Sequence, residues 1–417
     1  MSQLFMVQGD RPLIRKRLLL VLMGLILTTV TARAEDEPTR QEVDQLKQRI
    51  EDLEKKQEKD AEEFGKFSDL VKYVSIGGVL SGAYQYEWVD GPSDPDDLGR
   101  GAVAFQPEIS ITPTEKDEIF LKFGFAAGNG LPGVTPFILA PWAAGLEDDV
   151  KDINGRNRDY LLQAWYKHTF EFSEDHSLGL TGGIIDSTNY LDDNAYANDE
   201  YTQFMNEALV NASNGFLPSW DIGGAAEWDI GRFGVRGVYM NVGENDDGNN
   251  YNFYGAQVMV TLDTALGEGH YRVNYNFTSK AFLDPDDTSK ERQDVVIFSF
   301  DQELGDILGA WIRLAYGSDN ALVDYKSLFS GGINISGKWW GREQDNIGIG
   351  CGYLDGPEQT DESIDYTQVA EGYVRFGLNE YLFMTFDLQY MKDKYVNTAS
   401  ENDVDGWIAG VRMTAEF

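Results

Sequence analysis

The chain of 417 residues is long enough for one large domain or for two to three domains of ordinary size. It carries 34 Lys and Arg against 70 Asp and Glu, a formal net charge of −36, which argues against nucleic acid as a partner because the phosphates would be repelled. The only cysteine is Cys351, so an intramolecular disulfide framework is excluded.

The first 34 residues have the pattern of a secretory signal peptide. Basic residues at Arg11 and 15–17 precede the apolar run LLLVLMGLILTTV at 18–30, and the sequence ARA at 32–34 supplies a small-residue cleavage site. A single transmembrane anchor is the alternative, but the apolar run is shorter than the ~20 residues that a spanning helix needs. We therefore predict that residues 1–34 direct export and are removed.

Residues 35–73 are predicted to form a helix of the coiled-coil type, followed by a linker. Val43, Leu46, Ile50 and Leu53 recur at heptad a and d positions. The stretch RIEDLE resembles a pattern of three-stranded coiled coils in which Arg and Glu bridge neighbouring helices, which assigns trimer contacts to Arg49, Ile50, Leu53 and Glu54. A solvated amphipathic linker is the alternative, because so few heptads are marginal alone.

From Val74 to the end the hydrophobic pattern has period two, as in β-strands with one apolar and one polar face. In HYRVNYNFTS at 270–279, for example, aromatic and aliphatic residues alternate with Arg, Asn and Thr. Such segments predict sixteen strands, near 74–88, 101–113, 117–127, 159–172, 177–186, 218–230, 232–243, 251–262, 269–280, 292–303, 307–318, 328–338, 345–355, 364–378, 380–391 and 404–417.

The connections between these strands alternate in length. Some are tight, such as TEK, SEDH, Gly231 and Asn379, while 128–158, 187–217 and 392–403 are long. Short turns at one end and long loops at the other are typical of a bacterial outer-membrane barrel, in which one face of each strand contacts lipid. We predict an all-β fold for residues 74–417, a 16-stranded antiparallel transmembrane β-barrel, with the apolar face of the last strand and Phe417 turned toward lipid.

The polar face of a barrel of this size lines an aqueous lumen. Alternation along the strands places the following side chains on that inner face: Lys122, Lys167, Arg272, Arg313, Glu371, Arg375, Asp387, Gln389 and Arg412. Simple solvation of the wall is the alternative role for each of them.

The loop at 187–217 is predicted to fold inward and narrow the pore, because a loop this long with no helix or strand of its own is usually functional. The residues expected at the constriction are Asp192, Asp193, Asn194, Tyr196, Asn198, Asp199, Glu200 and Gln203. The four acidic residues among them, at 192, 193, 199 and 200, are expected to face basic wall residues across the opening. Tyr190, Tyr196 and Phe204 are expected to offer flat surfaces to sugar rings. Packing within an outer loop is the alternative.

Two runs resemble the carbohydrate-selective porins of the OprB type. The first is DSTNYLDDNAYANDEYTQF at 186–204, with Asn206 and Asn211 after it, and the second is AEGYVRFGLNEYLFMTFDLQYM at 370–391. The resemblance spans roughly residues 74–417 and implies a sixteen-stranded outer-membrane barrel that passes sugars and other small solutes by diffusion. The coiled segment is an addition to the core of that family.

Catalytic and metal-binding patterns are weak. The three histidines, His168, His176 and His270, are scattered, without an HExxH motif or a close cluster that could bind zinc, and no G-x-S-x-G motif occurs. The Asp-rich stretches at 90–97 and 244–250 do not match the spacing of an EF-hand loop. We predict no enzyme activity, no cofactor and no metal site.

Together these features predict an outer-membrane porin of a Gram-negative bacterium, with residues 35–73 in the periplasm. Its water-filled channel would let small hydrophilic solutes, sugars foremost, diffuse passively. The alternatives are a general or cation-preferring porin, favoured by the negative charge, and a structural outer-membrane protein with a coiled-coil stalk. The expected partners are small solutes, outer-membrane lipid and two further copies in a homo-trimer.

Overall fold

The computed structural model describes residues 71–417, except Asn157, Asp246 and 358–363, together with isolated residues of a helix between 45 and 59. The chain divides into two units, Met1–Leu70 and Val71–Phe417. In the first unit, Arg49 and Leu53 are helical and Leu53 is exposed, while the predicted signal at 1–34 and the trimer contacts Ile50 and Glu54 lie outside the described residues.

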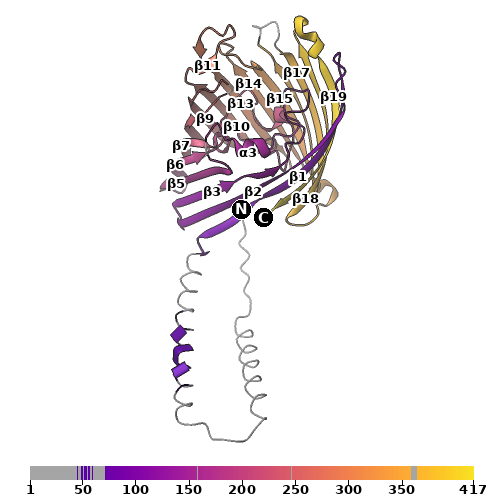
Figure 1. The fold of residues 1–417 in the computed structure, drawn as a ribbon. Helices are drawn as coiled ribbons and strands as arrows, with labels where there is room; N and C mark the ends of the chain where they lie inside the picture. The colour runs from indigo at the N-terminus through magenta and orange to yellow at the C-terminus, as the bar shows by residue number, and fades with distance from the viewer. Residues whose placement is uncertain are drawn as a thin grey trace, which may run out of the picture. The chain divides into compact units, whose positions relative to one another are not determined.

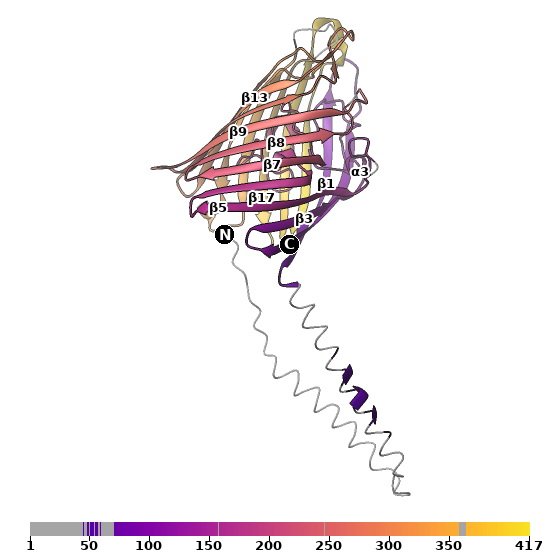
Figure 2. The same cartoon turned by 90° about the vertical axis from the view of Figure 1, so that its left-hand side faces the viewer.

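The second unit is a closed antiparallel β-barrel of sixteen strands, as predicted (Figures 1 and 2). Consecutive strands pair around the wall, and β1 closes the barrel by pairing with β19. The strands of the wall are β1 (Val74–Asp90), β2 (Leu98–Thr114), β3 (Asp117–Phe123), β4 (Phe125–Ala127), β5 (Leu161–Ser173), β6 (His176–Ile185), β7 (Asp221–Ile230), β8 (Phe233–Val242), β9 (Tyr251–Thr264), β10 (Gly267–Thr278), β13 (Asp294–Leu304), β14 (Leu308–Gly317), β15 (Ser327–Ser336), β16 (Asn346–Asp355), β17 (Ile364–Gly377), β18 (Leu382–Tyr395) and β19 (Val404–Glu416).

The third wall strand is interrupted at Gly124, which separates β3 from β4. A Cβ atom at this position would lie 2.8 Å from the Leu162 side chain and 2.9 Å from that of Val150. Val150 belongs to the short helix α3 (Glu147–Lys151), which packs here against β4. Glycine is therefore the residue that lets the helix approach the wall.

The alternation predicted from the sequence separates lipid-facing from inward side chains. On β1, Tyr84 and Trp88 are 53% and 48% exposed, whereas Gln85 and Glu87 are buried. At the seam, where β1 pairs with β19, outward-facing residues lie opposite outward-facing residues: Trp88 lies opposite Trp407 and Leu80 opposite Ala415. Phe417 is exposed, and its backbone exchanges two hydrogen bonds with Gly78, so the terminal residue continues the seam.

The connections fall into two classes, and the two ends of the barrel are named after them. Tight turns join the strands on the turn side, except that β15 and β16 are joined by 337–345, and most loop-side connections are longer. One predicted long connection was wrong in extent: β18 continues to Tyr395, because Asp393 still points inward and accepts a hydrogen bond from Thr367. The other elements in the connections are η1 (Ser187–Asn189), α4 (Glu207–Val210), β11 (Phe282–Leu283), β12 (Lys290–Glu291), η2 (Gly337–Trp340) and η3 (Asn397–Asn402).

Candidate functional site

The loop between β6 and β7, residues 186–220, lies inside the barrel because the inward side chains of distant strands bind it. Arg313 of β14 donates to the Asp192 carboxylate at 2.8 Å, and both side chains are fully buried. Glu371 of β17 accepts the backbone N–H groups of Met205 and Asn206 at 2.7 and 2.9 Å. These contacts attach the loop to β14 at Asp192 and to β17 at Met205 and Asn206.

Arg412 of β19 completes this attachment. Its guanidinium donates to the backbone carbonyls of Glu200 and Gln203 at 2.7 and 2.9 Å. Backbone carbonyls are thus the acceptors for this buried arginine. The side chain of Glu200 is thereby left to line a cavity.

A second set of contacts fixes the start of the loop to β9, β10 and β13. Gln257 accepts the backbone N–H of Asp192 at 2.8 Å. Arg272 pairs with Asp193 at 2.8 Å and with Asp301 at 2.5 Å. Because these partners come from three neighbouring strands, the loop is held across a broad arc of the wall.

The loop between β4 and β5, residues 128–160, packs onto the first loop. The carbonyl of Pro141 accepts hydrogen bonds from Gln85 at 3.0 Å and from Gln389 at 2.9 Å. The indole N–H of Trp142 donates to the Glu200 carbonyl at 3.0 Å. Two loops, rather than the single loop predicted, therefore occupy the lumen.

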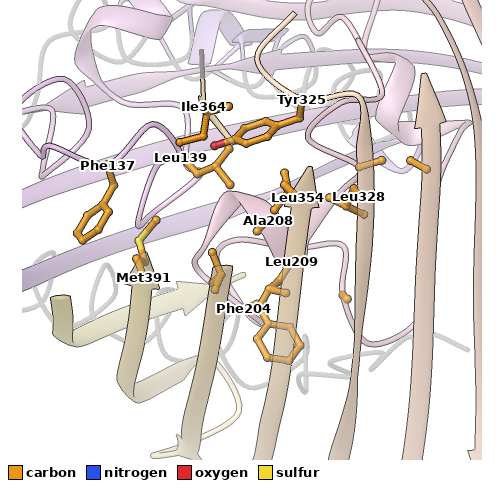
Figure 3. Close-up of a cluster of buried hydrophobic side chains, with 14 of the residues drawn as sticks. Phe137, Leu139, Phe204, Ala208, Leu209, Tyr325, Leu328, Leu354, Ile364 and Met391 are labelled. Atoms are coloured by element: carbon orange, nitrogen blue, oxygen red, sulfur yellow. The ribbon is translucent and has the colours of Figure 1, made fainter. Parts of the chain in front are cut away.

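A buried apolar cluster lies between these loops and the wall from β13 to β19. Phe204 and Leu209 from the first loop and Leu139 from the second meet side chains such as Trp311 and Tyr373. Figure 3 shows these loop residues gathered in front of the strands, with Tyr325 beside Leu139. This part of the lumen is packed like a protein interior.

The predicted constriction residues take three different roles. Asp193, Asn198, Asp199 and Glu200 line a cavity. Other members hold the loop together or hold it to the wall: Asn194 bonds to Ser299, Gln203 accepts the N–H of Asn198 and donates to the Ala195 carbonyl, and Asp192 pairs with Arg313. Tyr196 is half-buried and packs against Gly309.

The predicted wall residues that do not bind the loop are paired with their neighbours. Lys122 contacts Glu108 at 3.1 Å, and Lys167 contacts Glu227 at 2.5 Å. Arg375 pairs with Glu416. Asp387 accepts a hydrogen bond from Gln389, which in turn binds Pro141 and Asn206.

Three expectations for this loop were wrong. Phe204 and Tyr190 are buried in apolar clusters, so they offer no surface to a sugar. Asp192 contacts its arginine directly and does not face it across an opening. The loop also has short helical elements of its own, η1 and α4, whose first turns are capped by Asp186 and Asn206.

The turn-side cavity lies between the loop 186–220 and the strands β1, β2, β3 and β5, with a volume of about 790 Å³. Its charged lining residues are Glu108, Asp186, Asp193, Asp199, Glu200, Glu416 and Lys122. Amides at Gln106, Gln163, Asn189 and Asn198 and the rings of Tyr201 and Trp220 complete the polar and aromatic lining. Sequence reasoning missed Gln106 and Tyr201, which bond to each other at 2.9 Å.

Glu200 lies in the loop rather than in a spanning strand. Burial raises the pKa of its carboxyl group to about 8, and the neighbouring charge of Asp199 acts in the same direction. The carboxyl group is therefore largely neutral at pH 7 and becomes a negative charge in alkaline solution.

The loop-side pocket, of about 270 Å³, lies on the other side of the two loops. Segments that join different strand pairs contribute Glu207, Asn214, Phe216, Asp247, Phe282, Gln293 and Tyr325. Among the described residues there is no group of three or more His, Cys, Asp or Glu with a geometry for a metal ion. Within the same part of the chain, no helix is both long and apolar enough to cross a membrane.

Comparison with known proteins gives results that agree with this architecture. Residues 145–417 match the family model described as carbohydrate-selective porin, OprB family. A structure of Pseudomonas putida OprB at high pH superposes with a TM-score of 0.63 at 14% identity, covering 85% of this chain and 96% of that chain.

Two further proteins are similar. The outer-membrane channel DcaP of Acinetobacter baumannii has a TM-score of 0.50 at 10% identity, covering 82% of this chain and 97% of its own. An uncharacterised protein of Aquifex aeolicus is 29% identical over 293 residues, which are 69% of this chain and 81% of that protein. The structural likenesses, at these identities, indicate the fold.

Proposed function

Because the chain belongs to the OprB family of carbohydrate-selective porins, we propose that its barrel is a passive channel through which small sugars cross the outer membrane. The channel needs no chemical cycle. A hydrated polar lumen lowers the barrier for a small hydrophilic solute, and the two inward loops set the size and chemistry of what passes. Family and fold point to a channel rather than to an enzyme.

The observation that carries this proposal is the lining of the turn-side cavity. Carboxylates accept hydrogen bonds from sugar hydroxyls, while the amides of Gln163 and Asn189 both donate and accept. The half-buried ring of Trp220 adds flat apolar surface. A site of convergent polar groups with an aromatic face suits a neutral polyol.

In this proposal the predicted constriction residues have two roles, contact with the solute and attachment of the loop to the wall. Asp193, Asn198, Asp199 and Glu200 meet the solute, because they line the cavity. Asp192 and the other loop residues that bind the wall keep the loop in place. The wall residues act mainly by holding the loop or by neutralising one another.

The test is single-channel conductance of the purified protein in a planar bilayer, titrated with glucose and with maltose. We expect a current that falls saturably as sugar enters the lumen. A useful variant is Glu108→Gln, in the cavity, matched by Glu115→Gln in an exposed turn. The first should change the half-blocking sugar concentration and the second should not.

A cation-preferring channel is the second candidate, because six acidic side chains and a single lysine are found among the described residues that line the turn-side cavity. A lumen with this charge concentrates cations and repels anions. The reversal potential under a potassium chloride gradient measures this preference. Cation-selective current that is indifferent to sugar would favour this candidate over the first.

For the N-terminal region we propose a signal at 1–34 and, at 35–73, a periplasmic helix that assembles three copies. The support is the heptad pattern and the helical conformation of the described residues between 45 and 59. Deletion of 35–67 should leave the single-channel current intact and lower the mass of the assembly in light scattering. Loss of current on deletion would contradict a purely assembling role, and an unchanged mass would favour a structural stalk.

A further inference from the structure

The loop-side pocket has a lining that differs from that of the turn-side cavity. It is enclosed by side chains from loop 128–160, loop 186–220 and three shorter loop-side connections. A solute arriving from the loop side would meet this pocket before the turn-side cavity. Its chemistry is therefore informative about which solutes are admitted.

Hydrogen-bond acceptors dominate this pocket. Glu207, Asp247 and Asp324 contribute carboxylates, and no lysine or arginine is found among the described residues that line it. Two of these carboxylates are positioned by backbone groups, since Glu207 accepts the N–H of Ala140 at 3.0 Å and Asp247 accepts that of Leu283 at 3.1 Å. The acceptors are thus held in place before any solute arrives.

Asn214 supplies an acceptor that the protein does not satisfy. Its side chain is only 4% exposed, and its amide nitrogen donates to the Lys326 carbonyl at 3.1 Å. Its Oδ1 atom has no hydrogen-bond partner. A buried acceptor without a donor is costly, so a ligand that brings a donor to this position is favoured.

Three aromatic rings and four aliphatic side chains form the apolar part of the lining. Phe216, Phe282 and Tyr325 come from three separate segments. The hydroxyl of Tyr325 is already bonded to Thr367 at 2.7 Å, so what Tyr325 offers to the pocket is its ring. Ring faces attract cations as well as the apolar faces of sugars.

The basic side chains that lie nearest in sequence to the lining are engaged with carboxylates outside it. Lys326 pairs with Asp319 at 3.0 Å, and Arg292 lies 3.6 Å from Asp294. A positive charge within the pocket would therefore come from the solute. A solute with a positive charge gains most, because three carboxylates act on it in a partly enclosed space.

We propose that the loop-side pocket is a binding site for amino sugars, whose ammonium group meets the acceptors at Glu207 and Asn214 while the sugar ring lies against Phe216 and Phe282. This inference rests on the proposed sugar channel and names the class of sugar that its loop side prefers. Neutral sugars pass but bind the pocket more weakly, and anionic sugars are repelled.

The test compares glucosamine, glucose and glucuronate as blockers of single-channel current when each is added to the loop side, below the pKa of the glucosamine ammonium group. We expect glucosamine to block at the lowest concentration. Glu207→Gln keeps the size of the side chain and an acceptor for Ala140 but removes the charge. It should raise the half-blocking concentration of glucosamine about tenfold, the usual loss for a charge-assisted hydrogen bond, and leave that of glucose within about twofold.

Asp286→Asn is the matched control, because this exposed residue lies in the same loop as Phe282 but outside the pocket. It removes the same charge and should leave glucosamine block unchanged. Phe282→Ala is a second variant, which should weaken block by both glucosamine and glucose. Equal block by glucosamine and glucose in the wild-type protein would overturn the amino-sugar site and leave the sugar channel standing, whereas absence of current would overturn both.

Discussion

The two sides of loop 186–220 meet the barrel wall in opposite ways. Toward β13–β19 the loop buries Phe204 and Leu209 in an apolar cluster, and its polar contacts there are buried as well. Toward β1–β5 the same loop leaves Asp199 and Glu200 on a polar cavity of about 790 Å³. The face of the loop that packs against β13–β19, called the dry side below, fixes the loop in place. The face that lines the turn-side cavity, called the wet side, remains accessible to solute. A lumen can thus be narrowed without being filled.

The largest effect on this contrast is expected from Arg313→Ala. The change leaves Asp192 as a buried charge without its partner, which costs about 3–5 kcal/mol. We expect loop 186–220 to detach from the barrel wall and the single-channel conductance to increase. Arg292→Ala, which removes an exposed arginine at the loop side, is the control and should not alter conductance. An unchanged current in the first variant would contradict the role of this pair.

Leu209→Ala should loosen the dry side without touching a charge. Leu209 is fully buried, and removing its side chain from a packed cluster costs about 2–5 kcal/mol. We expect greater current noise and a lower temperature for loss of sugar block. Leu266→Ala, which truncates an exposed leucine in the turn between β9 and β10, should change neither property.

Glu371→Ala should free a short part of the loop. The backbone N–H groups of Met205 and Asn206 lose their acceptor, at a cost of about 1–3 kcal/mol. Hydrogen exchange of peptides that contain these two residues should become about ten- to a hundredfold faster. Exchange that stays as slow as in the wild-type protein would show that the apolar cluster alone holds this segment.

The smallest effect concerns the wet side and pH. Because burial raises the pKa of Glu200 to about 8, this carboxyl group gains its negative charge as the pH rises through that value. The preference for potassium over chloride should therefore increase between pH 7 and pH 9. Glu200→Gln should remove this increase, and an increase that persists in the variant would assign it to another group.

The barrel could be predicted from the sequence because its pattern is local. Period-two alternation in segments such as 270–279 marks each strand without knowledge of its neighbours. The boundary of β18 was missed for the same reason, since Lys392, Asp393 and Lys394 resemble a polar loop until Asp393 is seen to accept its hydrogen bond from Thr367.

The inward position of the loop could be expected from its length, but its attachment could not. Asp192 and Arg313 are 121 positions apart, and Asn206 and Glu371 are 165 apart. No local pattern indicates such pairs. Phe204 was read as a surface for sugars because aromatic residues in a polar loop can serve either purpose, and only the packing against Trp311 and Tyr373 decides between them.

The seam between β1 and β19 has a consequence for biogenesis. Ser81 and Thr414, which are bonded across it at 3.0 Å, are 333 positions apart, so this pairing forms only after nearly the whole wall has been laid down. Until then both strands present unpaired edges that could join the strands of other chains. Closure of the barrel at this seam therefore competes with pairing between chains.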